Sequence, residues 1–328
     1  MSRLACLGLA LTLTISATAT AQTIQVDGSS TVYPISREAA QRFMRTEREA
    51  RIEVAYSGTT GGFAAFCAGE TDISNASRPI DAAELALCAE NEIEFIELPI
   101  AVDALTIVVH PDNRWVRHLT IDELKRIWEP AAEGVITNWR QVRDGFPDRP
   151  LVLFGRGQTS GTYDYFTGAV VGEIRASRQD YTASDNIDFL VAGIAGEPDA
   201  LGFFGIGGFA PNFEILKDVA VDSGSGPVFA NIREVHAGRY QPLTRPLFLY
   251  VNAARAADNP TLRRFVEFYL DDVARWVVFT GYMPLDEAAY RKATDHFAAR
   301  RTGSAFGGVT RYDLTIEEIL SGVAGATN

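Results

Sequence analysis

The feature that most constrains this fold is one arrangement that occurs three times along the chain. A short apolar segment ends in a cluster of Gly, Ser and Thr, and a stretch of alternating apolar and polar residues follows. The clusters are residues 28–31 (GSST), 58–62 (GTTGG) and 155–162 (GRGQTSGT). Repeated units of strand, loop and helix predict a mainly parallel sheet that is flanked by helices. We therefore expect an α/β fold.

The expected elements follow this pattern. Strands are expected before the three clusters, over 23–26, 51–56 and 150–154. Helices are expected after them and farther along the chain, over 34–49, 63–68, 81–90, 120–128, 162–171, 259–280 and 286–300. Thr120 and Glu123 have the spacing of a capping box.

Two apolar, extended segments, 98–110 and 245–252, separate regions of different character. The 328 residues are enough for two domains, since a domain commonly holds about 100 to 200 residues. We therefore predict two lobes that are joined by these segments as two crossing strands. The predicted division is a signal peptide over 1–21, a first lobe over 22–100, a second lobe over 101–245, and a return to the first lobe with C-terminal helices over 246–328.

The first residues have the order of a secretory signal. Arg3 precedes an apolar run over 4–15, and Ala19 and Ala21 then form a small-residue cleavage site before Gln22. The apolar run is too short to span a bilayer as a helix. We expect a soluble protein that is exported through a cleavable signal peptide.

The charge of the chain limits its partners. The 30 basic and 42 acidic residues give a net charge of −12, so a broad basic face for nucleic acid or an anionic membrane is not expected. Any bound anion must be held locally. The four His residues have no metal-ligand spacing, and we expect neither a metal nor another cofactor.

Two cysteines follow the predicted signal peptide, Cys67 and Cys88. In an oxidising compartment an even pair is most simply a disulfide, and two buried thiols are the alternative. A catalytic cysteine is disfavoured because no His lies between Gln22 and Val109 to activate one.

The three clusters also have the chemistry of an oxyanion site. A helix N-terminus presents unpaired backbone N–H groups and a partial positive charge, and Ser or Thr hydroxyls add donors. Each cluster alone is better explained by ordinary helix capping. Because two lie in the predicted first lobe and one in the second, we expect the three to converge on a cleft from opposite sides.

Two arginines are candidate charge partners. Arg156 lies within the third cluster, and its guanidinium matches two oxygens of a tetrahedral anion; a surface arginine or an ion pair between the lobes is the alternative. Ser77 and Arg78 end a polar cluster over 72–79 and are further candidate donors, although a turn before the next helix explains them as well. No GKS or GKT follows the glycines and no GxSxG occurs, which excludes a P-loop and a nucleophile elbow.

Taken in order, four segments resemble the substrate-binding protein of the bacterial high-affinity phosphate ABC transporter: 27–34 (DGSSTVYP), 57–63 (SGTTGGF), 72–80 (DISNASRPI) and 155–162 (GRGQTSGT). The similarity continues through 119–128 (LTIDELKRIW), 136–139 (ITNW) and 281–285 (GYMPL), so it covers nearly all of the chain after the signal. The resemblance implies a two-lobe periplasmic binding protein fold of type II, which closes over one dehydrated phosphate.

By motif match, the resemblance implies ligand contacts from all three clusters, and Ser77 and Arg78 complete the candidate set: Ser30, Thr31, Thr59, Ser77, Arg78, Arg156, Ser160, Gly161 and Thr162. Two positions depart from the family pattern. Ser77 replaces an Asp that accepts a hydrogen bond from the phosphate OH, and Gln158 replaces an Asp that pairs with the arginine. We therefore expect weaker rejection of sulfate, unless Asp72 or Asp164 acts as the acceptor.

We expect a non-enzymatic carrier, a monomer that captures inorganic phosphate in the periplasm and delivers it to the membrane permease of an ABC transporter. A binding protein for another tetrahedral oxyanion such as sulfate is one alternative. A secreted phosphatase-like hydrolase is another, but it needs a metal cluster or an activated nucleophile, and neither is visible in the sequence. A protein that kept the fold for adhesion or signalling is the third.

Overall fold

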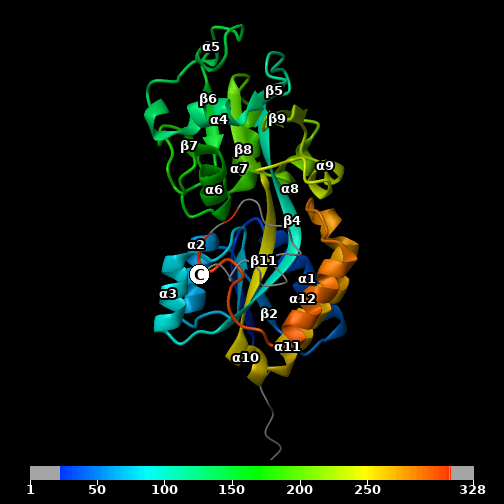
Figure 1. Cartoon of the computed structure of the whole chain (residues 1–328). Coiled ribbons are helices and arrows are strands. Elements are labelled where there is room, and N and C mark those ends of the chain that lie inside the picture. The colour runs from blue at the N-terminus through cyan, green and yellow to red at the C-terminus, as the bar shows by residue number, and fades with distance from the viewer. Residues whose placement is uncertain (1–22, 310, 312–328) are drawn as a thin grey trace, which may run out of the picture.

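Two long strands run through the middle of the molecule and connect its two halves (Figure 1). They are β4 (Phe95–Val109) and β11 (Thr244–Asn252), which pair with each other in antiparallel orientation. The predicted crossing segments coincide with these two strands to within a few residues. This computed structural model describes residues 23–309 and 311, so the predicted signal peptide lies outside the described residues.

The described residues form one mixed sheet of eleven strands: β1 (Ile24–Gly28), β2 (Ile52–Val54), β3 (Ile73–Ala76), β4, β5 (His118–Thr120), β6 (Val152–Gly155), β7 (Thr182–Ala183), β8 (Ala200–Gly205), β9 (Lys217–Asp222), β10 (Pro227–Val228) and β11. The strand order is β2-β1-β3-β11-β4-β8-β6-β7, and β9 pairs with β4, β5 and β10 beside this path. β1 is parallel to β2 and β3, and β6 is parallel to β7 and β8. Each antiparallel pair in this sheet involves β4, β9 or β11.

Helices cover both halves of the sheet (Figure 1). The lower half carries α1 (Tyr33–Thr46), α2 (Thr59–Cys67), α3 (Ala82–Glu90), α10 (Ala253–Asp258), α11 (Pro260–Trp276) and α12 (Glu287–Ala298). The upper half carries α4 (Ile121–Trp128), α5 (Trp139–Val142), α6 (Gly161–Phe166), α7 (Ile187–Ala195), α8 (Ile206–Phe209) and α9 (Ile232–His236). The α/β class is confirmed, with a parallel group of strands in each half.

Local signals in the sequence account for several helix boundaries. Thr120 Oγ1 accepts a hydrogen bond from Glu123 N at 3.1 Å, and Glu123 Oε2 accepts one from Thr120 N at 2.9 Å. These two bonds are the predicted capping box, which opens α4. Asn259 caps α11 in a similar position, and Pro260 occupies its first turn, where a missing N–H has no cost.

Two predicted elements differ from the structure. Helix α2 begins at Thr59 and not at Phe63, because Gly58, with a φ of 83°, turns the chain so that the second cluster already forms the first helical turn. The segment 72–79 was interpreted either as a cluster of candidate donors or as a turn, but its residues Ile73–Ala76 form β3, which pairs with β1 and β11. Polar Ser74 and Asn75 concealed this strand, although both are fully buried within it.

The centre of the molecule is apolar. All fifteen residues of β4 are buried, since its first part pairs with β11 and its last part with β8 and β9. A strand that is covered on both faces is expected to be a continuous apolar run. Among the described residues, no helix combines the length and the hydropathy that crossing a membrane requires.

Candidate functional site

The three Gly, Ser and Thr clusters follow β1, β2 and β6, and the structure brings them together where the two halves join. Close backbone approach explains two of the glycines. Gly28 has a φ of 124°, and a Cβ at that position would lie 2.2 Å from the carbonyl oxygen of Asn75. A Cβ at Gly62 would lie 2.3 Å from the Cα of Gly28, so the first two clusters are in direct backbone contact.

Hydroxyl groups from the two halves touch across this junction. Thr31 Oγ1 of the first cluster lies 3.2 Å from Thr162 Oγ1 of the third. Thr59 Oγ1 and Ser77 Oγ are also 3.2 Å apart. A Cβ at Gly161 would lie 2.5 Å from Thr59 Oγ1 and 2.7 Å from Ser77 Oγ, so only glycine fits beside these two oxygens. The junction is therefore lined with small donors from both sides.

Arg156 is buried among these hydroxyls, with 1% of its surface exposed. Its Nε donates to Ser160 Oγ at 3.2 Å, and its Nη2 donates to Ser30 Oγ at 2.6 Å. Its Nη1 is buried without a hydrogen-bond partner among the described residues. Burial lowers the pKa of Arg156, and the charge of Asp185 opposes this shift only in part. A buried cation with an unfilled donor is a strong point of attraction for an anion.

Arg78 is equally buried, but its five N–H donors are all used. Its Nε donates to Asp164 at 2.7 Å, Nη1 to Glu84 at 2.7 Å and to the carbonyl of Pro79, and Nη2 to Glu84 at 2.7 Å and to Thr60. Burial alone would lower the pKa of Arg78, but Glu84 and Asp164 raise it above its ordinary value. Arg78 was one of the predicted ligand contacts, but none of its donors is free for a ligand.

The two carboxylates considered as replacement acceptors are also occupied. Asp164 binds Arg175 through both of its oxygens, each at 3.0 Å, in addition to Arg78. Asp72 accepts one bond from the backbone N–H of Gln25 and another from Arg255 Nη1. Neither carboxylate has an oxygen without a partner.

Arg245 and Asp103 support the third cluster from the crossing strands, and the sequence prediction missed them. They form a fully buried ion pair of 2.7 Å between β11 and β4. Arg245 Nη2 also donates to Thr162 Oγ1 at 2.7 Å, and its Nη1 donates to the carbonyl of Gly161 at 3.0 Å. Asp103 and Arg245 are the single Asp, Glu, Lys or Arg in the apolar segments 98–110 and 245–252, and this is the signal that could have identified the pair.

Asp185 was also missed, because it lies in a different loop, just before α7. Its Oδ1 is 3.5 Å from Arg156 Nη2, and its Oδ2 accepts a hydrogen bond from Thr159 Oγ1. Gln158, by contrast, is exposed and donates to Gln179 Oε1 at 2.6 Å. The carboxylate nearest to Arg156 therefore comes from outside the third cluster.

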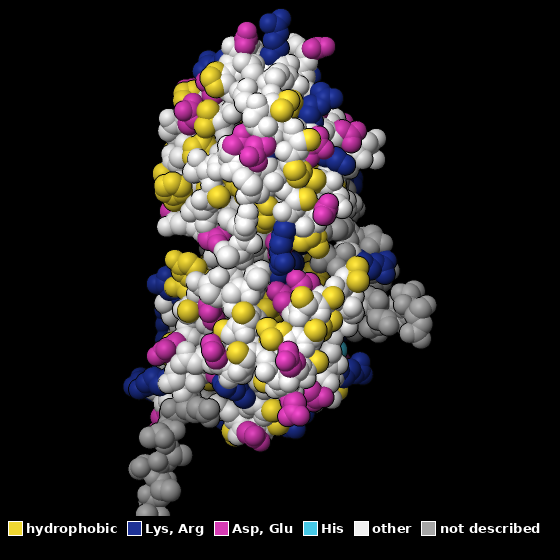
Figure 2. All heavy atoms as spheres, turned by 90° about the vertical axis from the view of Figure 1, so that its left-hand side faces the viewer, with side chains coloured by type: hydrophobic (Ala, Val, Ile, Leu, Met, Phe, Trp, Pro, Cys, Tyr) yellow, Lys and Arg dark blue, Asp and Glu magenta, His cyan; other side chains and the backbone are white. Residues whose placement is uncertain are grey.

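The surface around the junction carries mixed charge. Figure 2 shows basic and acidic side chains interspersed over the face on which α2, α3 and α6 lie, without a broad basic area on that face. The part of the chain that the structure describes contains no group of three or more His, Cys, Asp or Glu that could hold a metal ion.

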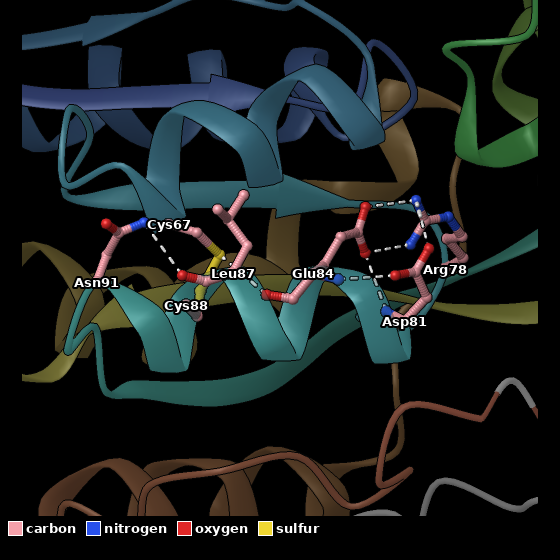
Figure 3. The surroundings of a disulfide bond; sticks show 7 residues. All are labelled: Cys67, Arg78, Asp81, Glu84, Leu87, Cys88 and Asn91. Atoms are coloured by element: carbon pink, nitrogen blue, oxygen red, sulfur yellow. Dashed lines mark hydrogen bonds and ion pairs between the residues drawn. A yellow bond between two sulfur atoms is a disulfide. The ribbon is translucent and has the colours of Figure 1, made fainter.

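A disulfide links the two helices beside the site. Cys67 and Cys88 are bonded, with their Cα atoms 4.3 Å apart, which confirms the predicted pairing. Figure 3 shows that α3 carries Glu84 near its start, facing Arg78, and Cys88 near its end. The bond thus ties α2, which begins at Thr59, to α3, whose Glu84 binds Arg78.

The chain is similar to known proteins over most of its length. Residues 14–273 match the family model of the PBP superfamily domain. Protein SphX of Synechocystis sp. is 48% identical over 301 residues, which are 92% of this chain and 90% of the relative. The phosphate-binding protein PstS of Staphylococcus haemolyticus is 32% identical and covers 81% of this chain and 82% of its own length. The crystal structure of a possible phosphate binding protein from Planctomyces limnophilus has a TM-score of 0.66 and 37% identity, and covers 86% of this chain and 99% of that one.

Proposed function

The chain belongs to the PBP superfamily and, within it, to the family that includes SphX and PstS, and from this premise we propose that it captures inorganic phosphate for an ABC transporter. It acts as a binding protein that delivers the anion to the membrane permease of the transporter. The relatives named phosphate-binding proteins support this substrate, and the chemistry of the junction agrees with it.

One observation supports the proposal most strongly: a buried arginine with an unfilled donor lies where hydroxyls from both halves meet. Phosphate is tetrahedral and charged, so it can accept from the Arg156 guanidinium and from several hydroxyl and backbone N–H groups at once. We assign the ligand contacts to Ser30, Thr31, Thr59, Ser77, Arg156, Ser160, Gly161 and Thr162. Arg78 is left out of this set because its donors are filled.

The mechanism we propose is capture by closure. Of the described residues, those up to 100 and those from 246 to 309 form one lobe, and residues 101–245 form the other, with β4 and β11 as the hinge. Thr31 and Thr59 then lie on one lobe and Arg156 and Thr162 on the other, so all contacts form only when the cleft shuts. Closure also removes the anion from water, which strengthens every charge-assisted hydrogen bond to it.

We base the proposed location, oligomeric state and cofactor requirement on the family to which the chain belongs. The protein is exported to the periplasm through the predicted signal peptide, acts as a monomer, and needs no cofactor. It is a carrier and not an enzyme. Its function therefore depends on reversible binding, and release at the permease requires the cleft to reopen.

The test is a titration of anion-stripped protein with phosphate, sulfate and arsenate, followed by calorimetry. We expect one saturable phosphate site for each chain and no turnover of a chromogenic phosphoester. Tight binding of sulfate without phosphate would support a different oxyanion carrier, and release of the chromophore would support a hydrolase. Absence of any anion binding would contradict the proposal and favour a protein that kept only the fold.

A further inference from the structure

Two charged groups beside the site have unfilled hydrogen-bonding atoms. Among the described residues, Asp185 Oδ1 is the one buried carboxylate oxygen without a partner, and Arg156 Nη1 is the one buried guanidinium nitrogen without a partner. These two residues are neighbours, since Asp185 Oδ1 lies 3.5 Å from Arg156 Nη2. An unfilled acceptor and an unfilled donor therefore belong to two neighbouring side chains.

The other carboxylates near the junction are not available in this way. Asp103 is bound by Arg245 and by the backbone N–H of Ile206. Asp164 is bound by two arginines. Among these carboxylates, only Asp185 combines proximity to Arg156 with an oxygen that has no hydrogen-bond partner.

The position of Asp185 is fixed from its other side. Thr159 Oγ1 donates to Oδ2, which leaves Oδ1 as the oxygen that faces Arg156. A Cβ at Gly157 would lie 3.3 Å from Oδ1, so glycine gives the carboxylate room beside the loop. About a third of the Asp185 side chain is exposed, while Oδ1 itself is buried. The carboxylate thus lies at the rim of the site and directs one oxygen inward.

A hydroxyl group is complementary to such a pair, because it accepts one hydrogen bond and donates another. Hydrogen phosphate carries a hydroxyl, whereas sulfate at neutral pH has only acceptor oxygens. We propose that Asp185 is a specificity-determining residue of the proposed phosphate site: its Oδ1 accepts the hydrogen bond of the protonated phosphate oxygen, to which Arg156 Nη1 donates. A sulfate oxygen in the same place would face the carboxylate without a proton between them, which disfavours binding.

The proposal rests on the proposed function, and its test compares two anions on one variant. Asp185→Asn removes the charge at almost constant shape. In mildly basic buffer, calorimetry is expected to show a loss of phosphate affinity of about tenfold or more, since bonds to charged groups are the stronger ones, together with a gain in sulfate affinity. The ratio of phosphate to sulfate affinity therefore falls on both counts.

Asp188→Asn is the matched control, because it removes the same charge from an exposed position in the first turn of α7. It is expected to leave the ratio unchanged. Thr159→Val is the second variant, which keeps the carboxylate but removes the bond that orients it. It is expected to lower the ratio in the same direction by a smaller amount, and it keeps the proposal testable if melting curves show that Asp185→Asn does not fold.

Two results would overturn the proposal. If Asp185→Asn raises the affinity for phosphate and for sulfate equally, the residue acts only as a distant charge. If it lowers both affinities equally, the residue only supports the loop, or water occupies the two unfilled atoms. If the wild-type protein binds no phosphate at all, the proposed function fails instead. The two failures are therefore distinguishable.

Discussion

Arg78 and Arg156 are both 1% exposed and lie beside the same loops, yet their hydrogen bonding differs. The five donors of Arg78 all have partners, and its carboxylate partners raise its pKa. Arg156 has an unfilled Nη1, and burial lowers its pKa. We therefore propose that the first arginine stabilises the folded state and that the second binds the anion. Burial is common to both arginines, so the proposed assignment depends on the unfilled donor of Arg156.

The largest expected effect is on stability and concerns Arg78. Arg78→Met leaves the buried carboxylates of Glu84 and Asp164 without their common partner, so we predict a loss of about 3 to 5 kcal/mol in the free energy of unfolding. Chemical denaturation without phosphate measures this change. Arg140→Met is the control, because the Arg140–Asp148 pair is exposed and contributes about 1 kcal/mol or less. A loss in Arg78→Met no greater than in the control would remove the distinction between the two arginines.

The next effect is on binding and concerns Arg156. We predict that Arg156→Ala loses about 2 to 5 kcal/mol of phosphate binding, by analogy with truncation of a buried charge pair. Its free energy of unfolding without phosphate is expected to fall much less than in Arg78→Met, since the lost side chain had an unfilled donor. Calorimetry and denaturation on the same preparation measure both quantities. Phosphate affinity like that of wild type would refute the assignment of Arg156.

The disulfide extends the comparison to the helices that support Arg78. Removing it with Cys67→Ala and Cys88→Ala opens a loop with a sequence separation of 21 residues, and we predict a loss of about 3 kcal/mol in the free energy of unfolding. Phosphate affinity is expected to change less than in Arg156→Ala, because neither cysteine lies among the assigned ligand contacts. Intact-mass analysis of protein purified from the periplasm checks the premise, and two free thiols there would contradict it.

A smaller effect concerns the shape of the molecule. The assigned contacts of Arg156 and Thr31 lie on opposite lobes, so phosphate is expected to favour the closed form and reduce the radius of gyration in solution scattering. Arg156→Ala should show a reduced response at the same phosphate concentration. Identical scattering curves for wild type with and without saturating phosphate would contradict closure about β4 and β11.

The smallest predicted effect concerns Ser77, which is fully buried beside Thr59. A hydroxyl can donate to a deprotonated phosphate oxygen, so wild-type affinity is expected to rise from mildly acidic to mildly basic buffer, as phosphate loses a proton. Ser77→Asp adds a negative charge that requires a proton on the ligand, and the trend should weaken or reverse by about 1 kcal/mol. Calorimetry in both buffers measures it. The same pH trend in wild type and variant would show that Ser77 does not face the ligand.

The parts of the molecule that could be predicted from the sequence depend on local patterns. The capping box of Thr120 and Glu123 and the crossing strands were predicted because their signals lie within a few consecutive residues. The three clusters were recognised for the same reason, since glycine beside Ser or Thr marks a loop that opens a helix. The start of α2 was misplaced because these same residues also fit a turn.

The parts that could not be predicted depend on partners that are distant in the chain. Arg78 was a plausible donor until its bonds to Glu84 and Asp164 were known, and the second of these residues lies 86 positions away. Asp185 gave no sequence signal, because its relation to Arg156 exists only in the folded loops. Strand β3 was not expected within the polar segment 72–79, because its polar side chains pack inside the sheet. For the two charged residues, the deciding information was which donors and acceptors are already filled.

The most direct test of this distinction is a crystal structure of the protein grown with phosphate. The account predicts density for one tetrahedral anion in contact with the Arg156 guanidinium and with hydroxyls of both lobes, while Arg78 keeps its bonds to Glu84 and Asp164. An anion bound to Arg78, or one that leaves Arg156 Nη1 without a partner, would contradict the account.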